Sequence, residues 1–94
     1  MSTLDHETIQ ARLRDLDGWQ LRDGTIEREW RFGDFGEAIA FINRVAELAE
    51  AADHHPDLHN SYATVQVALT THSEGGVTDK DLELAGRIDG VVAG

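Results

Sequence analysis

The sequence predicts an α+β fold in which three helices pack on one face of a four-stranded antiparallel sheet, in the order αββαββα. Three segments repeat apolar residues at helical spacing, and the segments between them alternate apolar with polar residues. The strands are too short for a self-sufficient sandwich, so the apolar sides of the helices are expected to cover one sheet face. The 94 residues contain no internal repeat or linker, which indicates a single domain over residues 1–94.

A first helix is expected from about Leu4 to Asp17. The segment Ser2-Thr3-Leu4-Asp5 resembles a capping box, in which a hydroxyl and a side chain three residues later satisfy free backbone N–H groups. Gly18 is a natural stop, because glycine readily takes the left-handed conformation that ends helices. The apolar residues at helical spacing are Ile9, Leu13 and Leu16.

A β-hairpin is expected next, centred on Asp23-Gly24. This dipeptide favours a type I′ turn, because both of its residues tolerate positive φ. The residues that alternate with polar neighbours are Trp19 and Leu21 before the turn and Ile26, Trp30 and Phe32 after it. Arg28 interrupts the apolar face, and the sequence leaves open whether it reaches the sheet edge or points into a site.

A second helix is expected from about Phe35 to Ala52. Asp34 is an N-cap acceptor and Glu37 follows at capping-box spacing. The apolar stripe consists of Ala38, Ile42, Val45, Ala46 and Ala49. Pro56 then enforces a break, because the residue before a proline is pushed out of the helical region, so Asp53-His54-His55-Pro56 is expected to form a loop.

Two strands and a third helix complete the chain. A short strand is expected over Asp57 to Asn60, and a clearer one over Ala63 to Thr71, where apolar and polar residues alternate. Gly75-Gly76 supplies a turn. The run Thr78-Asp79-Lys80-Asp81 has the cap-plus-acid spacing of a helix start, and its apolar stripe continues almost to the C-terminus.

Composition excludes several classes of function. The chain has no cysteine, which removes disulfides, thiolate metal sites and a cysteine nucleophile. Its net charge of -10 opposes direct binding to nucleic acid or to an anionic membrane. No leader peptide or membrane-spanning stretch is evident, so we expect a cytoplasmic protein. If the uncovered sheet face is apolar, a second copy would cover it, and we therefore expect a homo-oligomer.

Histidines are the candidate chemical groups. His54, His55 and His59 lie within six residues of one another, and His72 follows the last expected strand. Histidine titrates near neutrality, so such a cluster at element ends is a candidate for proton transfer. The alternative is that loops simply collect polar residues, as the distant His6 illustrates, and the spacing alone gives the two interpretations even weight.

Three carboxylates could support these histidines. Glu50 and Asp53 lie at the C-terminal end of the second expected helix, where the helix dipole disfavours negative charge, so they could orient an imidazole or hold an amino group of a ligand. Exposed and screened, they could equally have no role. Asp81 could simply complete a helix cap, or it could return close to His72.

The spacing of these residues resembles that of the pterin-4a-carbinolamine dehydratases. Glu50, His54-His55-Pro56, Tyr62, His72 and Asp81 follow one another as in the signature of that family. Further similar features, which extend the resemblance over nearly the whole chain, are Trp19, Thr70-Thr71-His72, Gly75-Gly76 and Thr78-Asp79-Lys80-Asp81. One position departs from the family: Leu58 stands where a tryptophan is common, and His59 follows where an aromatic residue is usual.

The resemblance implies removal of water from a 4a-hydroxytetrahydropterin, without metal or organic cofactor. By motif position, it implies active-site roles for His54, His55 and His72, with Asp81 as the nearby acid. Glu50, Asp53 and Pro56 become framing residues for the substrate, and Tyr62 is expected to be structural. It also implies homodimers or homotetramers and leaves open a pathway link to an aromatic amino acid hydroxylase.

Within the site, the chemistry needs one acid and one base, and two imidazoles can supply both. We expect His54 and His72 to form this pair and His55 to bind the substrate, and we exclude His59 and His6. Two other classes stay open. One is a non-enzymatic interaction module of the transcription-factor dimerisation type. The other is a metal site of histidines and carboxylates, which is disfavoured because adjacent histidines rarely reach one ion.

Overall fold

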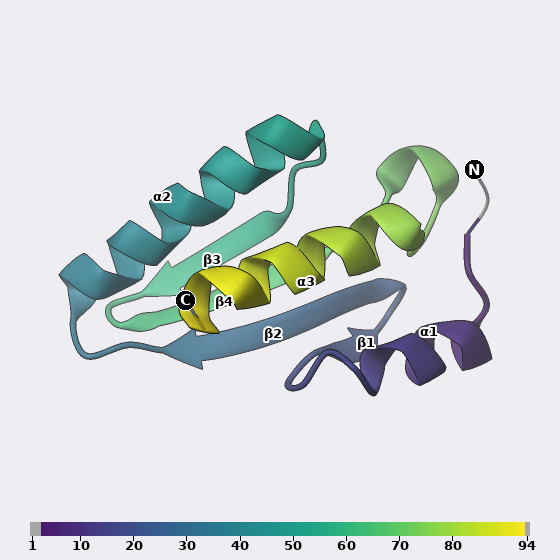
Figure 1. Ribbon diagram of the computed structural model, residues 1–94, viewed down its shortest axis with the longest axis horizontal. Coiled ribbons are helices and arrows are strands. Elements are labelled where there is room, and N and C mark those ends of the chain that lie inside the picture. The colour runs from purple at the N-terminus through teal and green to yellow at the C-terminus, as the bar shows by residue number, and fades with distance from the viewer. Residues whose placement is uncertain (1–2, 94) are drawn as a thin grey trace.

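A computed structural model describes residues 3–93 and confirms the predicted α+β fold. The sheet has the strand order β1-β2-β4-β3, and all three pairings are antiparallel. Helices α2 and α3 lie side by side over it and run in opposite directions, and α1 lies beside β1 at the sheet edge (Figure 1). The elements are α1 His6–Leu13, β1 Gln20–Arg22, β2 Thr25–Arg31, α2 Phe35–Ala52, β3 Asp57–Ser61, β4 Thr64–Leu69, the 3-10 turn η1 His72–Glu74 and α3 Asp79–Ala93.

The first helix is shorter than the sequence predicts. It is capped by Asp5, whose carboxylate accepts a hydrogen bond from the Thr8 backbone N–H at 2.8 Å. That hydrogen bond lowers the pKa of Asp5 below its usual value. The proposed hydroxyl cap Ser2 lies outside the described residues. After Leu13 the chain continues in turns as far as Gly18, whose φ of +87° ends the segment as expected.

The first hairpin has the predicted turn. Arg22 pairs with Thr25, so Asp23 and Gly24 form a two-residue loop, with φ values of +49° and +78°. The turn of the second hairpin, in contrast, contains no Gly, Pro, Asn or Asp. There Ser61 pairs with Thr64, and Tyr62 takes a positive φ of +49°.

The second helix begins and ends where the sequence predicts. The Asp34 carboxylate accepts from the Glu37 N–H at 2.8 Å, and the Glu37 carboxylate in turn accepts from the Gly33 N–H. Its buried face differs from the predicted stripe in three positions, because Phe41 is buried, Ile42 is only partly buried and Ala46 is exposed. Phe41 packs against Trp30, which is in β2, and against Phe32, the residue after β2. These contacts place that face of the helix against the sheet.

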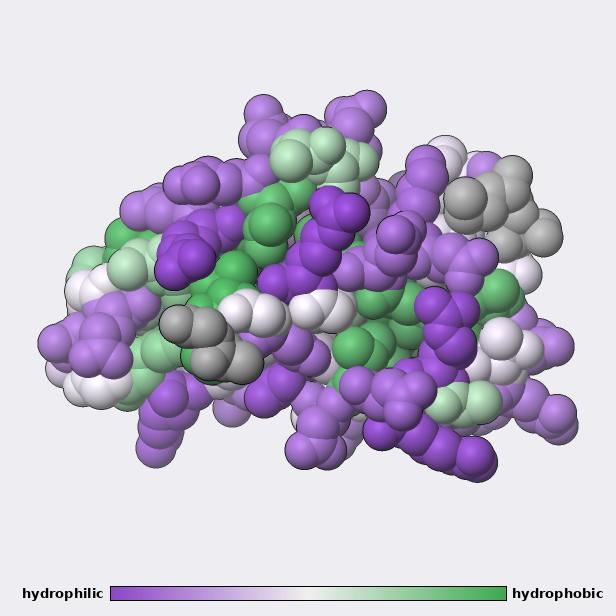
Figure 2. All heavy atoms as spheres, viewed as in Figure 1, coloured by the Kyte–Doolittle hydropathy of each residue, from purple (hydrophilic) through white to green (hydrophobic). Residues whose placement is uncertain are grey.

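The core lies between the helices and one sheet face, and the opposite face is polar. Fully buried core residues include Ile26, Val65, Val67 and Leu69 from the strands and Val45, Leu84 and Ile88 from the helices. Residues that alternate with them on the uncovered face include Gln20, Glu27, Glu29, Arg31, Asp57, His59, Thr64 and Gln66. A homo-oligomer was expected if the uncovered sheet face were apolar. Because this face is polar, that condition is not met. Viewed from the helix side, hydrophilic residues cover most of the molecule, with apolar patches in the gaps between elements (Figure 2).

Arg28 points to the helix side of the sheet, where it ties the hairpin to the last helix. Its guanidinium donates to Asp89 Oδ1 at 3.0 Å and to the Asp17 carbonyl at 2.7 Å, and it lies over the Trp30 ring. The same Asp89 oxygen accepts from the Trp19 indole at 2.9 Å. The side chains of this ion pair are only 26% and 24% exposed. Arg28 is thus a structural residue and lines neither of the cavities described below.

Replacement of Asp89 by alanine is expected to lower the free energy of unfolding by about 2 kcal/mol, because two donors lose their shared acceptor and a half-buried guanidinium loses its counter-charge. Chemical denaturation followed by tryptophan fluorescence measures the change. The control is Asp15→Ala, an exposed carboxylate in the turn after α1, which should stay within about 0.5 kcal/mol of the parent. Equal stabilities for the two variants would show that the Asp89 contacts contribute nothing net.

Candidate active site

The histidine loop is aimed by the way in which α2 ends. Asp53 adopts a left-handed conformation, with φ 49° and ψ 44°. The Asp53 N–H donates to the Glu50 carbonyl and the His54 N–H to the Ala49 carbonyl, which is the hydrogen-bond pattern of a Schellman motif. Glycine is the usual residue at this position, and aspartate is one of the few others that tolerate it. The motif turns the chain sharply, so that His54 is carried toward the start of α3.

His54 is held by a buried carboxylate from the third helix. Its Nε2 lies 2.5 Å from Asp81 Oδ1, and the two side chains are 11% and 0% exposed. The contact forms because α2 and α3 run in opposite directions, which places the end of one beside the start of the other (Figure 1). The approach of Asp81 to the His72 region, which the sequence left open, takes the form of a contact with Thr71, the residue before His72. The histidine that Asp81 contacts in the described part of the chain is His54, which was not anticipated.

Asp81 is fixed by a small network of polar groups. Its Oδ2 accepts from the Thr78 backbone N–H at 2.8 Å and from the Thr71 hydroxyl at 2.9 Å. Thr71 has only one hydroxyl proton, so in the 2.8 Å contact between the two threonine hydroxyls Thr78 is the donor. The predicted helix cap is therefore present, and the same carboxylate also serves His54. A buried carboxylate with three donors has its polar capacity well used.

This network decides which nitrogen of His54 carries a proton. An ionised carboxylate only accepts hydrogen bonds, so Nε2 of neutral His54 is the protonated nitrogen. Nδ1 has no hydrogen-bond partner among residues 3–93 and is left free to exchange a proton with a ligand. The arrangement corresponds in principle to the aspartate–histidine pair of serine proteases, where the acid fixes the tautomer and orientation of the ring.

His55 is held by the other acid that the sequence singled out. Its Nε2 forms a hydrogen bond with Glu50 Oε2, one turn back on α2, and both side chains are largely exposed. Glu50 therefore orients a histidine ring, which is one of the roles anticipated for it. Exposed pairs of this kind contribute little to stability.

The structure brings the three predicted histidines around one cavity. This cavity has a volume of about 270 Å³, and His72 enters it from η1, directly after the strand region that ends at Thr71. The residues that line it are Asp53, His54, His55, Thr70, Thr71, His72, Ser73 and Lys80. Six of the eight were named on sequence grounds alone within two segments, three in the histidine loop and three in the segment Thr70-Thr71-His72.

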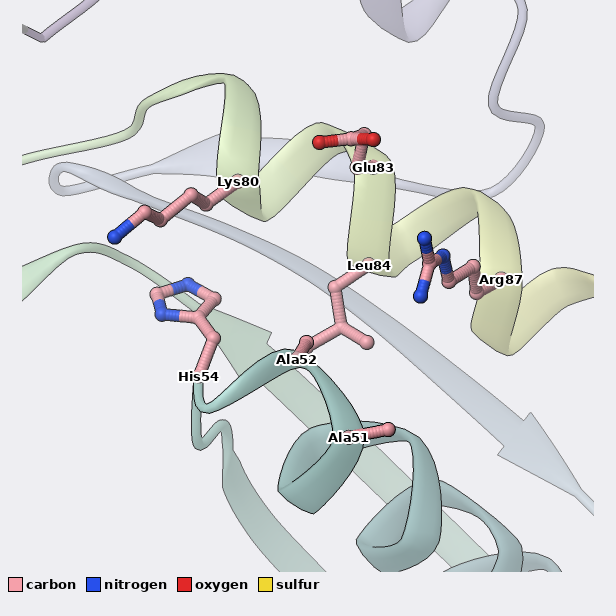
Figure 3. Close-up of a pocket in the computed structure, with 7 residues that line it drawn as sticks. All are labelled: Ala51, Ala52, His54, Lys80, Glu83, Leu84 and Arg87. Carbon is pink, nitrogen blue, oxygen red and sulfur yellow. The ribbon is translucent and has the colours of Figure 1, made fainter. Parts of the chain in front are cut away.

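A second cavity adjoins the first. It has a volume of about 260 Å³ and lies between the end of α2 and the first turns of α3 (Figure 3). His54 and Lys80 line both cavities, so they form the boundary between them. The remaining residues that line the second cavity are Ala51, Ala52, Glu83, Leu84 and Arg87.

Lys80 and Thr71 are among the residues of this region to which the sequence assigned no role. Lys80 carries a positive charge in the first turn of α3, where the helix dipole disfavours cations, and that conflict could have marked it. Thr71 occupies the next core-facing position after Val65, Val67 and Leu69, and it is buried. A threonine that continues an apolar alternation indicates a buried polar partner, which here is Asp81.

Other residues named from the sequence lie away from both cavities. His59 is on the polar sheet face opposite Gln66, and His6 lies at the start of α1. Leu58 is 39% exposed on the helix side of the edge strand, and it lines neither cavity. Tyr62 is 69% exposed at the tip of the second hairpin. Pro56 is partly buried in the loop between α2 and β3.

Within residues 3–93, no group of three or more histidine and carboxylate side chains is placed to hold a metal ion. In the same part of the chain, no helix combines the length and hydrophobicity required to cross a bilayer.

Known proteins give consistent matches. The chain matches a family described as pterin 4 alpha carbinolamine dehydratase over residues 2–91. A protein of Mycolicibacterium vanbaalenii that is named for this activity is 49% identical over 98% of this chain and 99% of its own length. One of Gloeobacter violaceus with a similar name is 49% identical over 90% and 97%.

Solved structures agree at the level of the fold. A crystal structure from Brucella melitensis, titled a transcriptional coactivator/pterin dehydratase, has a TM-score of 0.92 and 40% identity, covering 96% of this chain and 98% of its own. A pterin dehydratase-like protein described as a RuBisCO assembly factor has a TM-score of 0.64 at 22% identity, covering 78% and 84%, and supports the fold alone.

Proposed function

Because this chain belongs to the pterin 4 alpha carbinolamine dehydratase family, we propose that it removes water from 4a-hydroxytetrahydropterin to give quinonoid dihydropterin, in support of tetrahydropterin recycling. The observation that carries the proposal is the buried Asp81 carboxylate, which holds His54 at a cavity that His55 and His72 also line. Such a set of imidazoles, one of them fixed in orientation, suits proton transfer near neutral pH.

The proposed reaction needs two proton transfers. An acid donates a proton to the C4a hydroxyl, the C4a–O bond breaks and water leaves. A base removes the proton from N5 as the C4a=N5 double bond forms. His54 and His72 take these two roles and exchange their protons with solvent between turnovers, so no metal or organic cofactor is required.

The remaining site residues bind and frame the substrate. His55, held by Glu50, offers its Nδ1 to the pterin, and the Asp53 carboxylate is available to its amino groups. Pro56 fixes the loop that carries both histidines. Asp81 acts through His54 and is therefore a positioning residue.

The test is a stopped-flow measurement of 4a-hydroxytetrahydropterin dehydration. We expect the purified protein to accelerate the reaction above its spontaneous rate, in proportion to protein concentration and with saturation by substrate. Prior treatment with a chelator should leave the rate unchanged. If the purified protein contains stoichiometric metal and loses its activity on chelation, the metal-free mechanism is wrong. The absence of any acceleration would favour the alternative of a non-enzymatic interaction module of the transcription-factor dimerisation type.

We also propose that the protein acts in the cytoplasm as a homodimer or homotetramer, downstream of an aromatic amino acid hydroxylase. The family membership supports this assembly, whereas the polar uncovered sheet face does not explain it. Light scattering coupled to size-exclusion chromatography distinguishes a 10.4 kDa monomer from its multiples.

A further inference from the structure

The cavity between α2 and α3 carries an unusual charge for this protein. The chain has 18 acidic and 8 basic side chains, and three of the basic residues, Arg12, Arg22 and Arg28, are in ion pairs. Lys80 and Arg87 both line this one cavity, and within residues 3–93 neither has an ion pair or a side-chain hydrogen bond. Two unpaired cations thus lie at the same small cavity of a strongly acidic molecule.

The two cations lie on the same side of α3. They are seven residues apart, which is about two helical turns, so their side chains project in similar directions. In Figure 3 the Lys80 ammonium extends toward the His54 ring and the Arg87 guanidinium lies beyond Leu84, both toward α2, while the Glu83 carboxylate projects from the far edge of α3. With one acid and two bases at its rim, the cavity carries a net positive charge.

The position of this cavity relates it to one part of a pterin. The proposed reaction occurs at C4a and N5, so these atoms must face the histidines. C6 is the ring atom bonded to N5, and a natural pterin carries its substituent there. His54 lines both cavities, so a substrate whose N5 lies near His54 has the cavity between α2 and α3 within reach of its C6 substituent.

We infer that the substrate is a tetrahydropterin whose C6 substituent ends in an anionic group, a phosphate or a carboxylate, bound between Lys80 and Arg87. This inference rests on the proposed function and names its substrate class. Leu84 and Ala51 supply apolar surface for the atoms that link the ring to the charge. Arginine suits the planar, two-point recognition of either group, and lysine acts as a point charge.

The test compares three 4a-hydroxytetrahydropterins: one with a neutral dihydroxypropyl substituent, one with the phosphate ester of that substituent, and one whose substituent ends in a carboxylate. We expect kcat/KM to be about tenfold higher for at least one anionic substrate, chiefly through KM, since each exposed cation contributes a factor of a few. The arm with the higher value identifies phosphate or carboxylate. Raising the ionic strength to about 1 M should remove most of the preference, because salt screens exposed charges.

Substitutions of the two cations test whether the preference for anionic substrates arises at this cavity. Arg87→Gln should reduce the ratio of the anionic to the neutral kcat/KM about threefold to fivefold, and Lys80→Gln with Arg87→Gln should abolish it. The matched control is Arg44→Gln, which removes an exposed cation from α2 outside both cavities and should leave the ratio unchanged. Equilibrium binding of stable 7,8-dihydropterins with the same three substituents gives a readout that does not depend on turnover.

The possible failures are distinguishable. If no pterin is dehydrated faster than its spontaneous rate, the proposed function is wrong, and a binding preference for anionic dihydropterins would then stand by itself. If dehydration is catalysed with equal kcat/KM and equal affinity for neutral and anionic substrates, this inference is wrong and the proposed function stands. An equal loss of preference in Arg44→Gln would reduce the effect to net charge and overturn the assignment to this cavity.

Discussion

Replacing His54 with alanine is expected to slow enzymatic dehydration by about a hundredfold or more, because the reaction loses a positioned proton-transfer group. Of the three histidines that line the cavity, His54 is the most buried. Its ring is held by Asp81, which leaves only Nδ1 free for a ligand. Stopped-flow rates, with the spontaneous reaction subtracted, measure the loss. The variant with both His54→Ala and His72→Ala should retain no more than the background rate.

The matched control is His59→Ala, a histidine exposed on the polar sheet face and remote from both cavities. Its rate should stay within about twofold of the parent, since a surface substitution away from the site changes neither proton transfer nor folding. If the double variant of His54 and His72 retains the parent rate, the active-site assignment is wrong.

Replacing Asp81 is expected to affect both stability and activity. In Asp81→Ala, the Thr71 hydroxyl, the Thr78 N–H and the His54 ring all lose their acceptor in a buried environment. We expect the free energy of unfolding to fall by about 3 kcal/mol, since unsatisfied buried donors are costly. Chemical denaturation measures this change.

Asp81→Asn separates the catalytic role from the structural one. The amide keeps the shape of the side chain and retains an acceptor for Thr71 and Thr78, but it presents an N–H group to His54 and favours the wrong tautomer. We expect a loss of about a hundredfold in kcat with a smaller loss of stability than in the alanine variant.

The control for both variants is Asp79→Asn, two residues earlier, whose carboxylate pairs with Arg12 at the surface. It should remain within about 0.5 kcal/mol in stability and within about twofold in rate. If Asp81→Asn also keeps the parent kcat, Asp81 is a helix cap only, and His54 does not depend on it.

The parts of the fold that the sequence predicted well are those where local signals agree. The second helix is bounded correctly because an N-cap acid, a stripe of apolar residues and a proline all indicate the same segment. The first helix was predicted too long because Leu16 continues the helical spacing, although it packs against the core from a turn. The last strand stops at Leu69 because Thr71 pairs with Gly76 in a tight loop that holds η1.

The sequence could predict which histidines belong to the candidate site, but not which side chains contact one another there. Motif spacing indicated His54, His55 and His72, and all three line one cavity. That Asp81 contacts His54 depends on how α2 and α3 pack, which no local pattern encodes. Lys80 could have been marked by the conflict of its charge with the helix dipole, but its position between two cavities is a property of the packed helices.

The antiparallel packing of α2 against α3 has a consequence for how the site comes into being. His54 and Asp81 are 27 residues apart in the sequence, and the second hairpin lies between them. Closing that loop costs conformational entropy, which is recovered only when both helices are seated on the sheet. In a peptide that contains the histidine loop alone, the His54 ring would therefore not be oriented. The ability of the site to transfer protons would form only in the last step of folding, so activity would report that folding is complete.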